Sequence, residues 1–195
     1  MIIGINGYSG TGKDAVGKII QNLCSNENWE IKKFAGKLKE VASILTSIPV
    51  KYFEDQDFKR TVLGEEWWTN CDEGSQPMTV RDLLQKLGTE CMRTGLHSNT
   101  WVNALMVDYK PAKMDQYNPS KWVVTDTRFP NEAKAIKDKG GIVIRIDRPG
   151  IKPINNHPSE VGLDYWDFDY AIGNVSDLVS LEFTVENILK EIKVL

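Results

Sequence analysis

The stretch GYSGTGKD at residues 7–14 decides the fold, because it joins a short apolar run to an amphipathic segment. The run IIGIN at residues 2–6 is typical of a buried parallel strand. Apolar side chains then recur at helical spacing from Val16 to Leu23, which predicts a helix over about residues 13–24. A strand, a glycine-rich turn and a helix in this order form a phosphate-binding P-loop.

The residues of this loop are suited to holding phosphate groups. The pattern is Gly7, four residues, Gly12 and Lys13, and glycines allow the backbone to turn successive N–H groups toward phosphate oxygens. The positive end of the following helix adds to this attraction, and Lys13 is placed to reach the β- and γ-phosphates. The residues expected to bind ATP are Ser9, Gly10, Thr11, Gly12, Lys13, Asp14 and Ala15.

One position departs from the usual loop pattern. Asp14 follows Lys13, where a Ser or Thr hydroxyl normally ligates Mg²⁺. A carboxylate is also a hard oxygen ligand, so Asp14 is the candidate for holding the metal ion directly or through water. The alternative is that phosphate repels this carboxylate, which then faces away from the site.

The rest of the chain alternates between predicted strands and predicted helices. Strands are predicted over residues 30–35, 122–126, 142–146 and 170–172, and helices over residues 37–46, after a cap at Thr79, and after a cap at Ser176. This order predicts an α/β protein with a three-layer P-loop NTPase fold, in which about five parallel strands carry helices on both faces. Ligands in such folds bind beyond the carboxyl ends of the strands.

The stretch TDTR at residues 125–128 follows one of these strands and therefore lies at the ligand-binding edge. Asp126 stands where P-loop enzymes keep a carboxylate for Mg²⁺ or for a substrate hydroxyl. Arg128 can donate two hydrogen bonds to one phosphate group. We therefore predict that Lys13, Asp126 and Arg128 are the catalytic residues. The alternative is an Asp that caps a helix beside a surface Arg.

Length and composition set further limits. The 195 residues fit one domain, within which residues 50–77 are a candidate lid or insertion because they lack periodicity. The net charge of −3 gives no excess of positive charge, so we expect no nucleic-acid partner. The sequence contains no run of about 18 apolar residues, so no membrane span is predicted. The three cysteines, Cys24, Cys71 and Cys91, have no CxxC spacing and are expected to be free thiols in the cytoplasm.

Several of these stretches together resemble the bacteriophage deoxynucleoside monophosphate kinases. The stretches are GYSGTGKD at 7–14, FAGKLK at 34–39, LQKLGT at 84–89, WV at 101–102, TDTR at 125–128 and RPG at 148–150. They occur in order along essentially the whole chain, and the GKD variant with QxLGT and DxR is far more specific than a P-loop alone. The resemblance implies a P-loop kinase that uses Mg²⁺ and moves the γ-phosphoryl group of ATP to a deoxynucleoside monophosphate (dNMP).

The resemblance also implies roles for particular residues. Arg148 would join the loop residues that bind ATP, and Trp101 and Gln85 would recognise the base, although Trp101 fits a core tryptophan equally well. The residues that would surround the dNMP are Lys39, Arg60, Arg81, Gln85, Gly88, Thr89, Trp101, Asp126, Arg128 and Glu132. Members of the family can be homodimers, and a phage-encoded enzyme would act in the host cytoplasm.

Two other functions remain open at this point. A P-loop kinase for a different small phosphorylated acceptor would share the loop and the sheet. A non-catalytic nucleotide-binding switch would share them too, but such GTP switches carry an NKxD-type guanine signature. The near match NVSD at residues 174–177 lacks the Lys.

Overall fold

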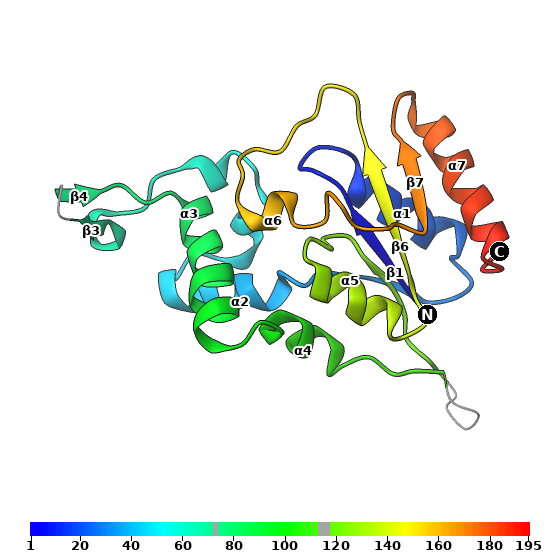
Figure 1. Cartoon of the computed structure of the whole chain (residues 1–195), viewed down its shortest axis with the longest axis horizontal. Coiled ribbons are helices and arrows are strands. Elements are labelled where there is room, and N and C mark those ends of the chain that lie inside the picture. Colours follow the sequence, from blue (N-terminus) through cyan, green and yellow to red (C-terminus); the bar gives the residue numbers. More distant parts are fainter. Residues whose placement is uncertain (72–73, 113–117) are drawn as a thin grey trace. The chain divides into compact units, whose positions relative to one another are not determined.

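The computed structural model describes residues 1–71, 74–112 and 118–195 (Figure 1). The chain divides into two compact units, each with its own internal contacts. The first unit consists of Met1–Phe34 and Leu105–Leu195, and the second consists of Ala35–Ala104. The prediction of a single domain over 1–195 stays a prediction, and each unit is described below by itself.

A five-stranded parallel sheet forms the centre of the first unit. The strands are β1 (Ile2–Asn6), β2 (Trp29–Lys32), β5 (Lys121–Val124), β6 (Ile142–Asp147) and β7 (Tyr170–Gly173). They lie in the order β2-β5-β1-β6-β7, and every neighbouring pair runs parallel. The register sets Ile3 of β1 against Val123 on one side and Ile142 on the other. The predicted α/β fold with about five parallel strands is therefore confirmed.

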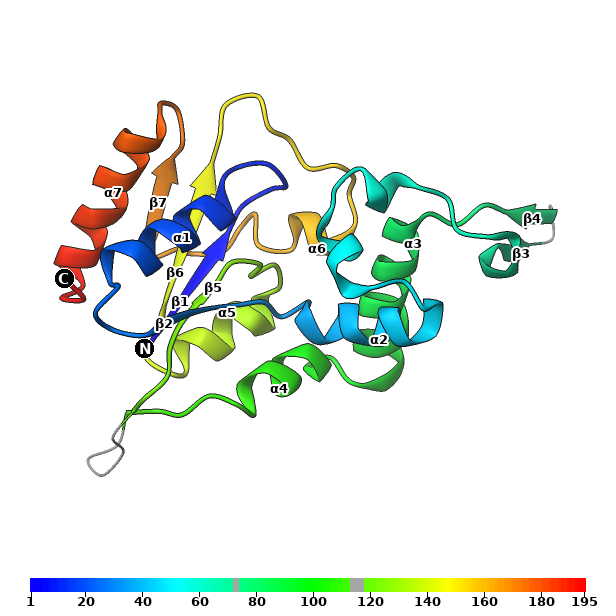
Figure 2. The same ribbon diagram turned by 180° about the vertical axis from the view of Figure 1, so that it is seen from behind.

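Helices cover both faces of this sheet (Figure 1 and Figure 2). The helices α1 (Lys13–Leu23) and α7 (Leu178–Glu191) lie on one face, and α5 (Pro130–Lys137) lies on the other. Successive side chains of a strand point to opposite faces, so Ile3 and Ile5 of β1 pack with α1 and α7. Gly4, between them, faces Ile136 of α5. The P-loop therefore leaves a fully buried strand and enters a helix that is fixed on the core.

The second unit is built from helices, short 3₁₀ turns and a hairpin. Its elements are α2 (Gly36–Thr46), η1 (Val50–Glu54), η2 (Phe58–Arg60), η3 (Glu65–Trp67), β3 (Thr69–Cys71), β4 (Gly74–Gln76), α3 (Val80–Gln85) and η4 (Lys86–Leu96). A small core of Ala42, Phe53, Leu63, Val80 and Leu83 holds the helices and turns together. Phe53 and Leu63 of the predicted lid over 50–77 therefore pack with Ala42 of α2 and with Val80 and Leu83 of α3. Residues 72–73 of that range lie outside the described residues.

Of the two helix caps predicted from the sequence, the structure confirms one and contradicts the other. Thr79 caps α3 as predicted: its hydroxyl accepts from the backbone N–H of Asp82 at 3.1 Å, and the Asp82 carboxylate accepts from the N–H of Thr79 at 2.9 Å. After Gln85 the chain winds into a π-helix that ends at Leu96. The cap predicted at Ser176 is wrong, because Asp177 accepts from Ser180 N–H at 2.9 Å and begins α7. Helix α4 (Thr100–Met106) follows the π-helix.

Free thiols are confirmed for the two cysteines whose side chains the structure describes, buried Cys24 and exposed Cys91. The side chain of Cys71 lies outside the described residues. Among residues 1–71, 74–112 and 118–195, no helix has the length and apolar character needed to cross a membrane.

The close packing of α1 on β5 predicts that Gly17→Ala destabilises the protein. A Cβ at position 17 would lie 2.6 Å from Cγ2 of Thr125. Alanine favours a helix by about 1 kcal/mol over glycine, but overpacking costs about 1–3 kcal/mol, so we expect a net loss of stability. Gly36→Ala is the control, since no atom lies within 4 Å of its Cβ position. Urea unfolding of both variants measures the effect, and a Gly17→Ala protein as stable as Gly36→Ala would contradict it.

Candidate functional site

The turn between β1 and α1 has the backbone of an anion-binding loop. Gly7 has a φ of 150° and Gly12, which begins α1, has a φ of 107°, both in the region that glycine adopts most readily. A Cβ on Gly7 would lie 2.5 Å from the carbonyl oxygen of Ile146, so the turn passes too close to β6 for any side chain. The loop is thereby held against the carboxyl end of the sheet, with the first N–H groups of α1 unused by the helix itself.

The loop is held by hydrogen bonds within itself and by one from a distant residue. The carbonyl oxygen of Tyr8 accepts from Thr11 Oγ1 at 2.9 Å and from Lys13 Nζ at 2.7 Å. From outside, Nδ2 of Asn174 donates to the carbonyl oxygen of Thr11 at 2.9 Å. Asn174 is the residue that opens the near match to the guanine signature. In the structure it supports the loop, directly after β7.

Lys13 lies in a position that disfavours its charge. The pKa of Lys13 is lowered from 10.5 to about 8, first by burial and then by the positive charge of Arg128, against the opposing effect of Asp14, Glu160 and Asp126. Arg128 therefore lies close enough to Lys13, at the carboxyl edge of the sheet, for its positive charge to disfavour the charge of the ammonium group. An anion bound there would relieve the repulsion. This electrostatic coupling brings together Lys13, Asp126 and Arg128, the three residues that the sequence predicts to be catalytic.

Arg128 is anchored through one nitrogen only. Its Nη1 donates to the carbonyl oxygen of Ser159 and to Oε1 of Glu160, each at 2.9 Å. Nη1 carries two hydrogens, so both are used. The three remaining hydrogens, on Nη2 and Nε, have no hydrogen-bond partner in the part of the chain that the structure describes. That unused edge of the guanidinium has the geometry for two parallel hydrogen bonds to a phosphate.

The carboxylates around this arginine have different tasks. Oδ1 of Asp126 accepts from the backbone N–H of Phe34 at 2.7 Å. The Glu132 side chain is buried, and its Oε2 accepts from the backbone N–H groups of Arg128 at 2.7 Å and Phe129 at 3.1 Å. Glu132 therefore fixes the backbone that carries Arg128. The predicted contact between Glu132 and the dNMP stays a prediction.

Glu160 is a site residue that the sequence analysis missed. It lies in the short helix α6 (Pro158–Val161), at the end of a stretch without periodicity. Two local signals precede it: Pro158 at the first helical position, and His157, whose Nδ1 accepts from Ser159 N–H at 3.2 Å. These signals predict a helix start. They carry no information about Arg128, which is 32 residues away in the chain.

A further network that the sequence did not reveal surrounds Arg145 of β6. Its guanidinium carbon lies 4.6 Å from the ring centroid of Tyr8, its Nη1 donates to Oδ1 of Asn6 at 2.7 Å, and its Nε donates to Oδ1 of Asp147 at 2.8 Å. The Tyr8 hydroxyl donates to Asp164 at 2.8 Å. Arg145 thus contacts the P-loop through Tyr8, and its positive charge is paired with the carboxylate of Asp147.

Asp14, the candidate metal ligand, is exposed on α1. Its Oδ1 accepts from the Thr125 hydroxyl at 2.9 Å and lies 3.5 Å from Nζ of Lys33. Among the described residues, no three His, Cys, Asp or Glu side chains form a group that would hold a metal ion by themselves. Of the other predicted ATP-binding residues, Arg148 is exposed just after the end of β6. Ser9 and Ala15 are half-buried in the loop and the start of α1.

The second unit contains the other predicted dNMP-binding residues. Nζ of the buried Lys39 lies 2.6 Å from Glu54, and Arg60 and Arg81 are bound to Asp57 and Gln56 at 3.2 and 3.1 Å. The Trp101 side chain is buried, and its indole N–H donates to the carbonyl oxygen of Gly88 at 2.8 Å. Trp101, in α4, thus has the environment of a core tryptophan and bonds to the π-helix that carries Gly88 and Thr89. Gln85 is the last residue of α3. Their contacts with the dNMP stay predictions.

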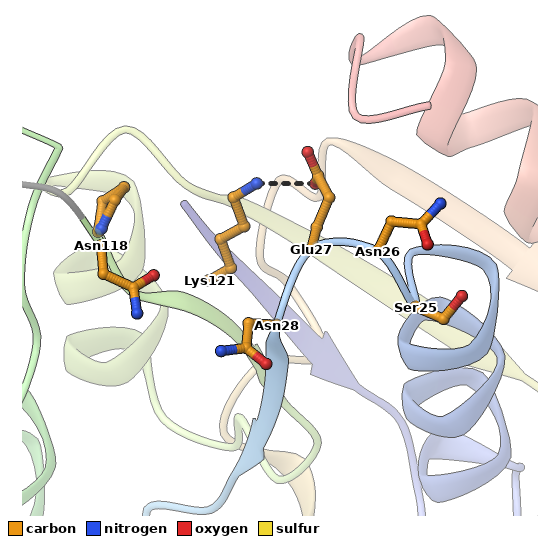
Figure 3. Close-up of a pocket in the computed structure, with 7 residues that line it drawn as sticks. Ser25, Asn26, Glu27, Asn28, Asn118 and Lys121 are labelled. Carbon is orange, nitrogen blue, oxygen red and sulfur yellow. Dashed lines mark ion pairs between the residues drawn. The ribbon is translucent and has the colours of Figure 1, made fainter.

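A hollow also lies at the opposite edge of the sheet (Figure 3). Its lining residues are Ser25, Asn26, Glu27, Asn28, Asn118, Pro119 and Lys121. Lys121 begins β5, and its Nζ lies 2.8 Å from Glu27, so the cation there is already paired. This hollow is at the amino ends of the strands, away from the P-loop, and does not form part of the candidate site.

The ion pair of Arg128 with buried Glu160 predicts an effect on stability. Arg128→Ala should lower the free energy of unfolding by about 1–3 kcal/mol, less than for a fully buried pair because the Arg128 side chain is 34% exposed. The reason is that the variant leaves a buried carboxylate without its cation. Arg128→Ala/Glu160→Gln, which removes that charge, should unfold at a higher urea concentration than Arg128→Ala. Equal midpoints for the two variants would contradict this account.

Comparison with known proteins shows the family of this chain. The family model for deoxynucleotide monophosphate kinases matches residues 51–185. A relative from Acanthamoeba polyphaga mimivirus is 35% identical over 84% of this chain and 82% of its own length. The deoxynucleoside-5'-monophosphate kinase of Escherichia phage T5 is 22% identical over 84% of this chain and 85% of its own.

Two further comparisons are weaker. The deoxynucleotide monophosphate kinase of Enterobacteria phage T4 is 34% identical, over 57% of this chain and 46% of that enzyme. The solved structure of shikimate kinase from Aquifex aeolicus aligns with 100% of this chain and 99% of its own, at 14% identity and a TM-score of 0.45. The fold assignment accordingly rests on the sheet topology described above. With a family model that matches most of its length, the chain belongs to the deoxynucleotide monophosphate kinase family.

Proposed function

We propose that this protein transfers the γ-phosphoryl group of ATP to a dNMP, giving the deoxynucleoside diphosphate and ADP. Membership of the family supports the reaction. The observation that carries the proposal is the pair of cations at the carboxyl edge of the sheet. Lys13 has its pKa lowered partly by Arg128, and Arg128 keeps one edge of its guanidinium free. A nucleotide phosphate is the anion that this arrangement fits.

The donor side of the reaction is assigned to the P-loop. The N–H groups of the loop and of the first turn of α1 would cradle the phosphates of ATP, and Lys13 would contact the β- and γ-phosphates. To reach them, the Lys13 ammonium must leave the carbonyl oxygen of Tyr8, to which it donates at 2.7 Å. The exchange replaces a neutral acceptor by a charged one, which makes a stronger hydrogen bond.

The acceptor side is assigned on the strength of the family resemblance. Arg128 would hold a phosphate with Nη2 and Nε, and Asp126 would accept from a substrate hydroxyl or contact the metal. The other residues assigned to the acceptor are Lys39, Arg60, Arg81, Gln85, Gly88, Thr89 and Trp101. Lys39 is the one buried cation among these residues, and its Nζ lies 2.6 Å from the carboxylate of Glu54.

Mg²⁺ is the metal that we assign to this reaction, with Asp14 as its protein ligand. Mg²⁺ is usually held by one or two carboxylates together with substrate phosphates and water, not by a cage of protein groups. An exposed carboxylate that stays oriented by the Thr125 hydroxyl at 2.9 Å fits that requirement. When bound, the ion neutralises charge on the phosphates.

The transfer itself needs no covalent intermediate. The positive groups hold the two phosphates in line and stabilise the charge that spreads over the moving phosphoryl group. Water must be kept out so that transfer wins over ATP hydrolysis, and we assign this task to residues 50–77. A homodimer and an activity in the host cytoplasm remain part of the same proposal, on the strength of the family resemblance.

The proposed reaction predicts acceptor-dependent formation of ADP. Purified protein with ATP and Mg²⁺ should release ADP when dAMP, dGMP, dCMP or dTMP is added, and at least one of the four should give a rate well above the rate without acceptor. Lys13→Ala should lower kcat/KM for ATP by about 100-fold or more, as expected when a charge contact in the transition state is lost. Equal ADP release with and without every acceptor would refute the kinase and favour a slow nucleotide-hydrolysing switch.

The lowered pKa of Lys13 predicts proton uptake on ATP binding. In the free protein Lys13 loses its charge as pH rises through about 8, and the phosphates of bound ATP would shift its pKa upward again. Affinity should therefore fall above pH 8, and ATP binding at pH 8.5 should take up protons. Calorimetry in two buffers with different ionisation enthalpies measures this uptake. Lys13→Met is the control, and an unchanged uptake in this variant would assign the proton to another group.

A further inference from the structure

We infer that Glu160 is a positioning residue for phosphoryl transfer, acting through Arg128. The inference rests on the proposed function, since it explains how the phosphate-binding edge of Arg128 is aimed. Neither the P-loop nor the TDTR stretch contains Glu160, which comes from a short helix late in the chain. Three observations carry the inference: the form of the ion pair, the burial of the carboxylate, and the support behind it.

The ion pair with Arg128 is monodentate. Arginine and a carboxylate commonly form two parallel hydrogen bonds, which is the stronger arrangement. Here Oε1 of Glu160 accepts from Nη1 at 2.9 Å, and the second hydrogen of Nη1 goes to the Ser159 carbonyl oxygen, also at 2.9 Å. A bidentate pair with this carboxylate would also use Nη2 or Nε. The observed pair keeps Nη2 and Nε available for a phosphate.

The burial of Glu160 makes this arrangement costly in folding stability. The Glu160 side chain is 2% exposed, and its second oxygen, Oε2, is buried without a hydrogen-bond partner in the described structure. A buried acceptor without a partner lowers stability. The carboxylate therefore keeps one oxygen unpaired while the other holds a single nitrogen of Arg128. This fits a group that orients the guanidinium better than a group that only adds stability.

The two groups that accept from Nη1 are themselves held in place by neighbouring residues. Ser159 supplies one of the two acceptors through its backbone, and the Ser159 N–H donates to Nδ1 of His157 at 3.2 Å. The Ser159 hydroxyl also lies 2.8 Å from that ring nitrogen. The two acceptors for Nη1 are thus adjacent residues at a capped helix start. With both hydrogens of Nη1 bound, rotation of the guanidinium about its Cζ–Nε bond is restricted, so its free edge keeps one direction.

Kinetics of variants in the full-length protein test this role. Glu160→Ala should lower kcat/KM for the dNMP by about 10- to 100-fold, as expected for a misplaced reacting group. Glu160→Gln, which keeps an acceptor oxygen, should retain more activity. The decisive comparison uses Arg128→Ala and the double variant Arg128→Ala/Glu160→Ala. If Glu160 acts through Arg128, the double variant should be no slower than Arg128→Ala. Multiplicative losses, or a Glu160→Ala enzyme with normal kinetics, would overturn the inference.

A matched control separates positioning from general stability. Asp169 is a partly buried carboxylate that pairs with Lys137 and accepts from Val143 N–H at 2.8 Å, at the amino end of β7. Asp169→Asn should lower the unfolding midpoint and leave kcat and KM unchanged. If it changed them as much as Glu160→Ala does, the effect at position 160 would reflect stability, and the inference would fail.

A spectroscopic measurement distinguishes the failure of this inference from the failure of the proposed function. In ¹⁵N-labelled wild-type protein, the two Nη groups of Arg128 should give separate signals because their exchange is slowed, and Glu160→Ala should merge them. The Arg128→Ala variant assigns the signals. If wild-type protein gives separate signals but no dNMP-dependent ADP, the proposed function fails, while the restraint of the Arg128 guanidinium by Glu160 is supported. Signals that stay separate in Glu160→Ala overturn the anchor, whatever the activity.

Discussion

Mutual repulsion between Lys13 and Arg128 is the constraint on which the candidate site depends. The fold brings the two cations together from opposite parts of the chain, one at the start of α1 and the other after β5. It buries Lys13 enough to lower its pKa to about 8. The carboxylates of Asp14, Glu160 and Asp126 oppose this lowering of the pKa. A nucleotide phosphate bound beside Lys13, as we propose, would also favour the charged form of its side chain.

Much of the fold and the position of the glycine-rich loop could be predicted from the sequence, because the signals are local. The apolar run at residues 2–6 and the glycine pattern at residues 7–12 together specify a strand, a turn and a helix within one short stretch. The strand before Asp126 carries a similarly local signal. In parallel α/β folds such signals also fix which edge of the sheet carries the ligand, so Lys13, Asp126 and Arg128 could be grouped without a structure.

The supporting residues could not be predicted, because their partners are distant in the chain. Glu160 and Asn174 act on Arg128 and on the carbonyl of Thr11, and only the sheet order brings these pairs together. The cap at Asp177 in place of Ser176 shows the other limit, since Ser and Asp both favour the N-cap position and the local sequence does not choose between two adjacent candidates. The change to a π-helix after Gln85 has no sequence signal that we can identify.

The use of Nη1 as an anchor has a consequence for which amino acid can occupy position 128. A guanidinium has two distinct sides, so one nitrogen can be fixed to the protein while the opposite side serves a ligand. An ammonium group has a single nitrogen, and its three hydrogens would have to be divided between the Ser159 carbonyl, the Glu160 carboxylate and the phosphate. The proposed role of position 128 therefore needs a side chain with separate structural and ligand-facing sides, which arginine provides and lysine does not.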